Sequence, residues 1–353
     1  MIEQAEWSRR ADRAEAAIVT RHLSPLFGLP GTALGRVCAP AAGADRWWWR
    51  WHYWWQAHLL DAQTDAWQRD PTPTRRRRIR AVARAVRIRN GGRWTNSYHD
   101  DIAWLGLALH RGAGVIGPSA GVALGRITRG LVAAWRASAG AGIPWRVGDR
   151  FRNAPANGPA AMLLARTGHP AEAAEICDWI FARLLLPSGL IADGIADGEP
   201  VDPTVYTYCQ GVALGAALAA GADRVRIHRL VAAVATGLTD DGVVHGGGGH
   251  NGGLFAGILV RNLALVADGL SGSSSTADRD TARLAAHLVL RSAEAAWDNA
   301  AMVVSGPVFG PQWSHPARVP AGPADPAAER DLSVQLSGWL LMEAAAGLGA
   351  GRG

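Results

Sequence analysis

The sequence predicts an all-α protein that forms one domain over residues 1–353. Apolar residues recur at i, i+3 and i+4 along most of the chain, and no segment shows the alternation of β-branched residues that is typical of a strand. Hydrophobic residues make up 48% of the chain and charged residues 19%, so a large core can form and disorder is not expected. No charge-rich linker and no shift in composition marks a domain boundary.

About twelve helices account for the periodic segments, and short stretches such as "GLPG", "DPTPT", "GIPW" and "SGSSSTADRD" separate them. This pattern favours an (α/α)6 barrel, a toroid in which six outer helices surround six inner ones. A helical solenoid is the competing fold, but the chain lacks a fixed repeat of about 34 or 40 residues. In order, the predicted helices cover residues 3–22, 46–68, 74–90, 100–112, 119–139, 157–167, 170–185, 207–221, 223–237, 252–269, 278–297 and 331–348.

The predicted helix 74–90 carries the most basic stretch of the chain, "TRRRRIRAVARAVRIRN". The net charge of +6 comes entirely from arginine, because the chain contains no lysine. We interpret this helix as the solvated face of a barrel helix, since its aliphatic residues form a stripe on the other side. A basic surface could also attract nucleic acid or anionic lipid, but no aromatic residue alternates with these arginines, as a single-strand binder would require. The arginines that lie around the outer side are Arg76, Arg80, Arg84 and Arg87.

No metal, cofactor or disulfide framework is expected. The three cysteines, Cys38, Cys177 and Cys209, are widely spaced and odd in number. His245 and His250 lie in a glycine-rich loop without a neighbouring Cys, Asp or Glu, which is a poor ligand set. The first residues contain no apolar run of about 7–15 residues, and no later apolar span reaches about 20 residues. We therefore expect a cytoplasmic monomer without a membrane span.

Tryptophan is unusually frequent, with 16 Trp against 4 Tyr and 5 Phe. In "RWWWRWHYWWQAHLLDA" aromatic residues occupy almost every side of the predicted helix 46–68, which should therefore be buried on most sides. Tryptophan also stacks well on the apolar face of a sugar ring. Most of these side chains are assigned to the core, and Trp54 is the candidate that reaches a cleft.

Two consecutive carboxylates, Asp100 and Asp101, stand at the start of a predicted helix in "NSYHDDIAWLGLALHRG". From spacing alone the more common role is structural, because Asp near a helix N-terminus accepts free backbone N–H groups and suits the positive helix end. The alternative is a catalytic pair that acts on a glycosidic bond and needs one ionised and one protonated carboxyl group. The helix end would stabilise one anion, and that anion would raise the pKa of its neighbour, so that the two groups titrate together.

Five blocks resemble glycoside hydrolase family 76, whose members include endo-α-1,6-mannanases. The blocks follow the family's order, and the resemblance as a whole runs from about "WWQAHLLDA" near residue 54 to about Ala346. They are "NSYHDDIAWLGLAL", "FRNAPANGPAAMLLARTGHPAEAAEICDWIFARLLLPSGLIADGI", "VYTYCQGVALGAAL", "GGLFAGILVRNLALV" and "DLSVQLSGWLLMEAAA". The resemblance implies an (α/α)6 barrel whose cleft holds an α-mannan chain, and a retaining hydrolysis of internal α-1,6 bonds.

The same resemblance assigns roles to single residues. Asp100 matches the nucleophile and Asp101 the general acid/base. Asp193, Tyr208 and Gln210 match positions where the family's enzymes hold sugar hydroxyls. Tyr98 and Trp54 are further aromatic candidates for binding the substrate. Asn153 and Asn157 match a further block, and we expect them to be loop and helix-cap residues.

The chain departs from the family pattern at three positions that flank the expected sugar site. His99 replaces an aromatic residue, Cys209 replaces Asn, and Ala192 replaces a residue that is often aromatic. Two alternatives on the same barrel are a transglycosylase and a hydrolase of another α-linked glycan. A third is a carbohydrate-binding protein that has lost catalysis, which only the changes at His99 and Cys209 support. A nucleic-acid binder would rest on the arginine-rich helix alone.

Overall fold

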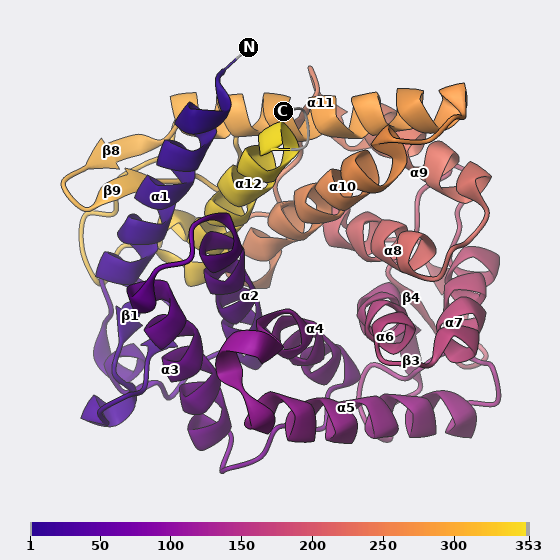
Figure 1. Ribbon diagram of the computed structural model, residues 1–353, viewed down its shortest axis with the longest axis horizontal. Coiled ribbons are helices and arrows are strands. Elements are labelled where there is room, and N and C mark those ends of the chain that lie inside the picture. Colours follow the sequence, from indigo (N-terminus) through magenta and orange to yellow (C-terminus); the bar gives the residue numbers. More distant parts are fainter. Residues whose placement is uncertain (1, 351–353) are drawn as a thin grey trace.

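The computed structural model describes residues 2–350, and within them twelve α-helices form two concentric rings (Figure 1). The inner ring closes because each inner helix packs on the next and the last packs on the first. This arrangement confirms the (α/α)6 barrel. The inner helices are α2 (Tyr53–Arg69), α4 (His99–Ile116), α6 (Ala154–Arg166), α8 (Thr207–Ala219), α10 (Phe255–Ser271) and α12 (Leu332–Ala350). The outer helices are α1 (Gln4–Arg21), α3 (Pro73–Arg89), α5 (Pro118–Ala137), α7 (Pro170–Arg183), α9 (Arg224–Gly237) and α11 (Thr276–Asp298).

Inner and outer helices differ in how much of their surface is buried, as their sequences suggest. Every residue of α6 from Ala154 to Leu164 is buried, because an inner helix has neighbours on nearly all sides. A Cβ on Gly158 would lie 2.5 Å from the side chain of Val212, so the glycine allows α6 and α8 to pack closely. The outer helix α5 buries one stripe only, which includes Ala120, Ala123, Ile127 and Leu131.

Helix α10 shows why hydropathy alone misleads in such a barrel. The stretch His250–Ser271 is long and apolar enough to cross a membrane, with a mean hydropathy of 1.5 over its best window. In the structure 67% of that window is buried inside the protein. The apolar composition is therefore accounted for by packing in the inner ring.

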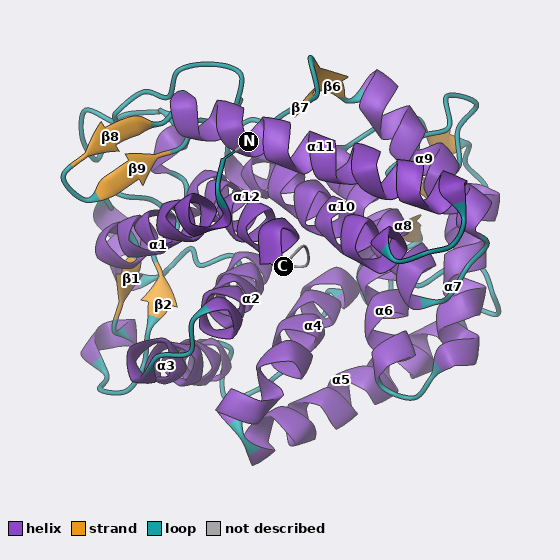
Figure 2. Cartoon of the chain, turned by 45° about the horizontal axis from the view of Figure 1, so that its top comes forward, coloured by secondary structure: helices purple, strands orange, loops and turns teal. Residues whose placement is uncertain are grey.

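In the part of the chain that the structure describes, nine short strands, which the sequence did not predict, lie in the connections between helices (Figure 2). Each has two or three residues, too few for an alternating pattern to be recognised. They form four small antiparallel sheets, β1–β2, β3–β4–β5, β6–β7 and β8–β9. Their bounds are β1 (Leu23–Ser24), β2 (Leu34–Gly35), β3 (Phe151–Asn153), β4 (Gly194–Ala196), β5 (Val201–Asp202), β6 (Thr239–Asp240), β7 (Val243–Val244), β8 (Ala301–Val303) and β9 (Gly306–Val308).

The helix predicted over residues 46–68 begins only at Tyr53, so its first part was wrong. Residues Gly43–Trp47 form a short 3-10 helix, and the chain then turns irregularly. Trp48 and His52 have positive φ angles of 56° and 41°, which a continuing right-handed helix excludes. As a result Trp47 and Trp49 are 64% and 75% exposed, whereas Trp48 is buried.

The fourth residue of four inner helices carries an amide that holds the preceding connection. In each case the side-chain oxygen accepts from the backbone N–H of one residue and the side-chain nitrogen donates to the carbonyl of the same residue. All four amides are fully buried, so they satisfy backbone groups that water does not reach. The pairs are Gln56 with Gly35, Asn157 with Ile143, Gln210 with Ile191 and Gln335 with Phe309, at 2.7–3.1 Å.

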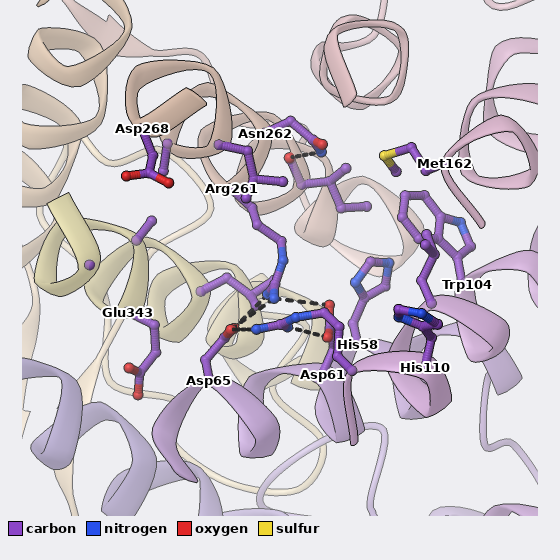
Figure 3. Close-up of a pocket in the computed structure, with 18 of the residues that line it drawn as sticks. His58, Asp61, Asp65, Trp104, His110, Met162, Arg261, Asn262, Asp268 and Glu343 are labelled. Atoms are coloured by element: carbon purple, nitrogen blue, oxygen red, sulfur yellow. Dashed lines mark hydrogen bonds and ion pairs between the residues drawn. The ribbon is translucent and has the colours of Figure 1, made fainter. Parts of the chain in front are cut away.

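A network of ion pairs joins α2, α4 and α10 around a cavity of about 500 Å³ (Figure 3). Arg111 pairs with Asp61 and Asp65, and Arg261 reaches the same two carboxylates at 3.1 and 2.6 Å. Burial alone would raise the pKa of Asp61, but the two guanidinium groups lower it to about 2. Asp61 therefore stays ionised throughout the physiological pH range.

Asp61→Ala is expected to lower the free energy of unfolding by about 3 kcal/mol, because it leaves buried guanidinium charge without one of its partners. Urea denaturation at pH 7 would measure the loss. Asp280→Ala is a matched control, since Asp280 pairs with Arg283 on the exposed face of α11, and about 0–1 kcal/mol is expected there. Equal losses in the two variants would contradict the role given to the network.

Candidate active site

A cavity of about 430 Å³ lies where several inner helices begin, and Asp100 and Asp101 both line it. Aromatic rings from α2, α4, α8, α10 and the connections form most of its wall, which suits the apolar faces of a sugar. The other lining residues are His52, Tyr53, Trp54, Tyr98, Trp104, Trp145, Phe151, Asn153, Tyr208, Asn251 and Phe255. The structure thus brings the aspartate pair together with Trp54, Tyr98 and Tyr208 in one place.

Asp100 lies in the first turn of α4 and is fixed by two hydrogen bonds. The indole Nε1 of Trp145 donates to its Oδ2 at 2.9 Å, and the backbone N–H of Asp101 donates to its Oδ1 at 2.8 Å. Burial raises the pKa of Asp100 to about 6, while the bond from Trp145 opposes that rise and the charge of Asp193 adds to it. Trp145 was not singled out from the sequence, since only the fold brings it next to α4.

Asp101 is the more buried member of the pair, and the amide Nδ2 of Asn96 donates to its Oδ2 at 2.5 Å. Burial and the neighbouring charge of Asp100 raise the pKa of Asp101 to about 8, which the bond from Asn96 only partly offsets. At neutral pH Asp100 is therefore mainly ionised and Asp101 mainly protonated. One carboxylate and one carboxylic acid side by side provide both a nucleophile and a proton donor.

The structural role considered for the pair accounts for Asp100 only. Its Oδ1 accepts a backbone N–H of the first turn, as an aspartate near a helix start commonly does. Within residues 2–350 the carboxyl group of Asp101 has no hydrogen bond to the backbone, and its side-chain partner is Asn96. Stabilisation of the helix end therefore does not explain why a second aspartate is buried here.

Asp193 lies beside the cavity rather than in its wall. The thiol of Cys209 donates to its Oδ1 at 3.6 Å, and burial raises the pKa of Asp193 to about 6. Its backbone carbonyl accepts from Ala154 N at 2.8 Å, which ties the segment before β4 to the start of α6. Tyr208, which lines the cavity, stacks on Phe255 with ring centres 3.9 Å apart.

Gln210 requires a correction, because the structure does not place it where it could bind a sugar hydroxyl. Its side chain is fully buried, and its Nε2 donates to the carbonyls of Ile191 and Tyr206 at 2.8 and 3.0 Å. Its Oε1 accepts from Ile191 N at 2.7 Å. The amide belongs to the set of four described above and positions the segment that leads to Asp193.

Asn153 caps α6, as expected, by accepting from Ala156 N at 3.2 Å, and it also lines the cavity. Asn157 is not a cap but one of the four buried amides. The departures His99 and Cys209 are not among the residues that line the cavity. His99 Nδ1 lies 2.7 Å from Pro144 O, in the connection that carries Trp145, and Cys209 contacts Asp193.

Comparisons with known proteins agree with this geometry. A family model, Glycosyl hydrolase family 76, matches residues 12–327, which confirms the resemblance seen in the sequence. Among solved structures the chain is similar to the α-1,6-mannanase GH76A of Salegentibacter sp. HEL1_6, with 27% identity, a TM-score of 0.80 and coverage of 96% of this chain and 99% of that chain. No curated protein sequence gives a significant match.

Two further structures extend the comparison. An inactive variant of the same mannanase, with two consecutive aspartates replaced by asparagine, was solved in complex with α-1,6-mannotriose; it is 27% identical, with a TM-score of 0.80 and coverage of 96% and 99% of the two chains. Dfg5 from Chaetomium thermophilum, in complex with glucosamine, is 17% identical, with a TM-score of 0.68 and coverage of 96% and 90%, and this likeness concerns the fold alone.

Proposed function

The chain belongs to glycosyl hydrolase family 76 and is a glycoside hydrolase, and we propose that it cleaves internal α-1,6-mannosidic bonds with retention of configuration. The main observation in its support is that, inside an aromatic cavity, Asp100 is mainly ionised at neutral pH while its neighbour Asp101 is mainly protonated. The similar mannanase supports it, because replacing two consecutive aspartates makes that enzyme inactive and it binds α-1,6-mannotriose.

In the first step Asp100 attacks the anomeric carbon while Asp101 gives its proton to the departing glycosidic oxygen. The bond between that carbon and the oxygen breaks, and an ester joins the sugar to Asp100. Once ionised, Asp101 removes a proton from a water molecule, which attacks the same carbon and releases Asp100. Two inversions at one carbon give net retention.

The surrounding residues prepare both carboxyl groups for these roles. The indole N–H of Trp145 stabilises negative charge on Asp100 and holds its Oδ2. The backbone N–H of Asp101, in the first turn of α4, holds its Oδ1. Burial keeps the proton on Asp101 at neutral pH, and Asn96 fixes the carboxyl group that carries it. Aromatic side chains such as Trp54 and Tyr208 provide surfaces on which sugar rings can stack.

Digestion of linear α-1,6-mannan, followed by sizing of the products, tests substrate and mode of action together. An endo-acting enzyme should release a range of oligosaccharides early and lower the mean polymer length quickly. Release of mannose alone would contradict internal cleavage. Absence of any reducing-end release, with binding retained, would favour the catalytically inactive alternative instead.

Retention should be visible by proton NMR early in the digestion, when the α-anomer of the new reducing end is expected first. The reason is that a nucleophilic mechanism needs carboxyl groups only about 5–5.5 Å apart, whereas inversion needs about 6.5–9.5 Å to admit a water molecule. Neighbouring residues in one helical turn favour the shorter separation. The β-anomer appearing first would contradict the proposed mechanism.

A further inference from the structure

Two unusual features of the sequence, a cluster of tryptophans and a run of arginines, lie on one outer surface of the barrel and have no role in catalysis. The first is an aromatic patch formed by the connection between α1 and α2 together with the end of α3. It surrounds a hollow of about 410 Å³ lined by Phe27, Trp47, Trp48, Trp49 and Arg89. Trp48 packs inward, but its two neighbours and Phe27 are more than half exposed, and Leu29 and Ile88 are about 40% exposed. A cluster of large apolar side chains left in solvent is typical of an interaction surface.

The second feature is an arginine stripe along α3. Four residues at spacings of four, four and three share one face of the helix, and all are exposed. They are Arg76, Arg80, Arg84 and Arg87. Within residues 2–350 none of these four forms an ion pair, whereas Arg75 and Arg78 of the same helix pair with Glu15. From Pro73 to Thr95 the chain contains no acidic residue at all, so the positive charge of the stripe is not neutralised locally.

The stripe borders the connection that carries the patch, because a Cβ on Gly31 would lie only 3.5 Å from Nη1 of Arg84. Arg89, at the end of α3, donates to Trp48 O at 3.0 and 2.8 Å, and its guanidinium lies 5.1 Å from the ring centre of Trp51. Ala33 N donates to Ala81 O at 3.2 Å, which fixes the aromatic connection against the middle of α3. Figure 1 shows α3 on the outside of the barrel, next to the β1 region. The two features therefore form one continuous surface, aromatic at one end and cationic along its length.

We propose that this surface docks on an anionic lipid bilayer. Tryptophan side chains occupy the headgroup level of a membrane, where their apolar ring and polar N–H are both accommodated, and phenylalanine adds apolar area beside them. Arginines beside them attract phosphate groups and other anionic headgroups, and the interaction adds up over several side chains.

The chemistry of the surface favours lipid over the two other occupants. A neutral glycan could stack on the aromatic residues, but it would leave the four arginines without a role. A single-stranded nucleic acid needs rings spaced along its path, whereas here the rings gather at one end of the stripe. Only three positions separate Trp49 from His52, which lines the catalytic cavity, so docking would hold the cleft next to the bilayer.

Co-sedimentation with vesicles tests the proposal independently of the catalytic assignment. The protein should bind vesicles of phosphatidylcholine with phosphatidylglycerol, bind phosphatidylcholine alone much more weakly, and be released as salt rises. Arg76→Gln with Arg84→Gln should weaken binding roughly 25-fold, at about fivefold for each arginine near an anionic surface. Trp47→Ala with Trp49→Ala should weaken it roughly tenfold or more, since the apolar area is lost.

A matched variant distinguishes the surface from simple net charge. Arg224 and Arg229 of α9 are exposed and lie outside the patch and the stripe, so Arg224→Gln with Arg229→Gln removes the same charge and should bind as the unaltered protein does. All three double variants should hydrolyse a soluble mannoside at the normal rate, which shows that they are folded. Equal weakening by the α9 variant would overturn the proposal. So would tryptophan-dependent binding to mannan, to an oligonucleotide or to a second copy of the chain, in the absence of vesicle binding.

Discussion

Asp101→Ala is expected to slow hydrolysis of α-1,6-mannan by about 10²–10⁴-fold, the usual contribution of a positioned acid or base. The natural leaving group is an alkoxide and departs slowly without a proton. The same variant should still transfer mannose to Asp100 from a mannoside that carries a highly acidic phenol, because such a phenolate leaves unprotonated. A burst of phenol followed by slow turnover in a stopped-flow assay would be the observable result.

Asp100→Ala is the matched control, since it removes the neighbouring carboxylate and leaves the acid in place. It should be slow with both substrates, because it loses several kcal/mol of transition-state stabilisation. Each loss of about 1.36 kcal/mol lowers the rate tenfold. If the activated substrate rescued Asp100→Ala and not Asp101→Ala, the two roles would have to be exchanged. Near-normal rates in both variants would mean that the pair has no catalytic role and only stabilises the start of the helix.

The dependence of kcat/KM on pH should be bell-shaped, with limbs near the pKa values of about 6 and about 8 found for Asp100 and Asp101. Below the lower value Asp100 takes up a proton and loses its nucleophilic character, and above the upper value Asp101 loses the proton it must donate. Because the two groups interact, the limbs describe the pair rather than two independent acids.

Two variants test the origin of the alkaline limb. Asp101→Ala, assayed with the acidic phenol leaving group, should lose that limb and keep the acid one. Asn96→Ala should move the limb to higher pH, since the bond from Asn96 lowers the pKa of Asp101. An alkaline limb that persists unchanged in Asp101→Ala would mean that a group other than Asp101 is responsible for it.

The helical periodicity of the sequence was enough to predict the barrel, because outer helices such as α5 bury one stripe that repeats every few residues, and short loops join them to inner helices such as α6 that are apolar on most sides. It failed at residues 46–52, where aromatic residues resemble a buried helix. There the backbone turns at Trp48 and His52, which have positive φ angles. The spacing of apolar residues in a sequence does not predict such angles. The short strands escaped prediction for a related reason, since pairs such as β6 and β7 depend on contact between segments rather than on a local pattern.

At the site, the aspartate pair could be predicted because its two members are adjacent in sequence and start a helix. Trp145 could not, since it lies 45 positions from Asp100 and meets it only through the fold. Gln210 was assigned to substrate because its block resembles the family, yet the structure uses its amide to hold Ile191. The recurrence of a buried amide at the fourth position of four inner helices is the signal that would have identified this role.

The central claim is that Asp100 becomes covalently bonded to the sugar during catalysis. Mass spectrometry of Asp101→Ala, quenched after reaction with the acidic phenyl mannoside, tests it most directly. The account predicts a protein heavier by one mannosyl residue, with the added mass on the peptide containing Asp100 and lost when Asp100 is also replaced. An adduct on Asp193, or no adduct although phenol is released in a burst, would contradict it.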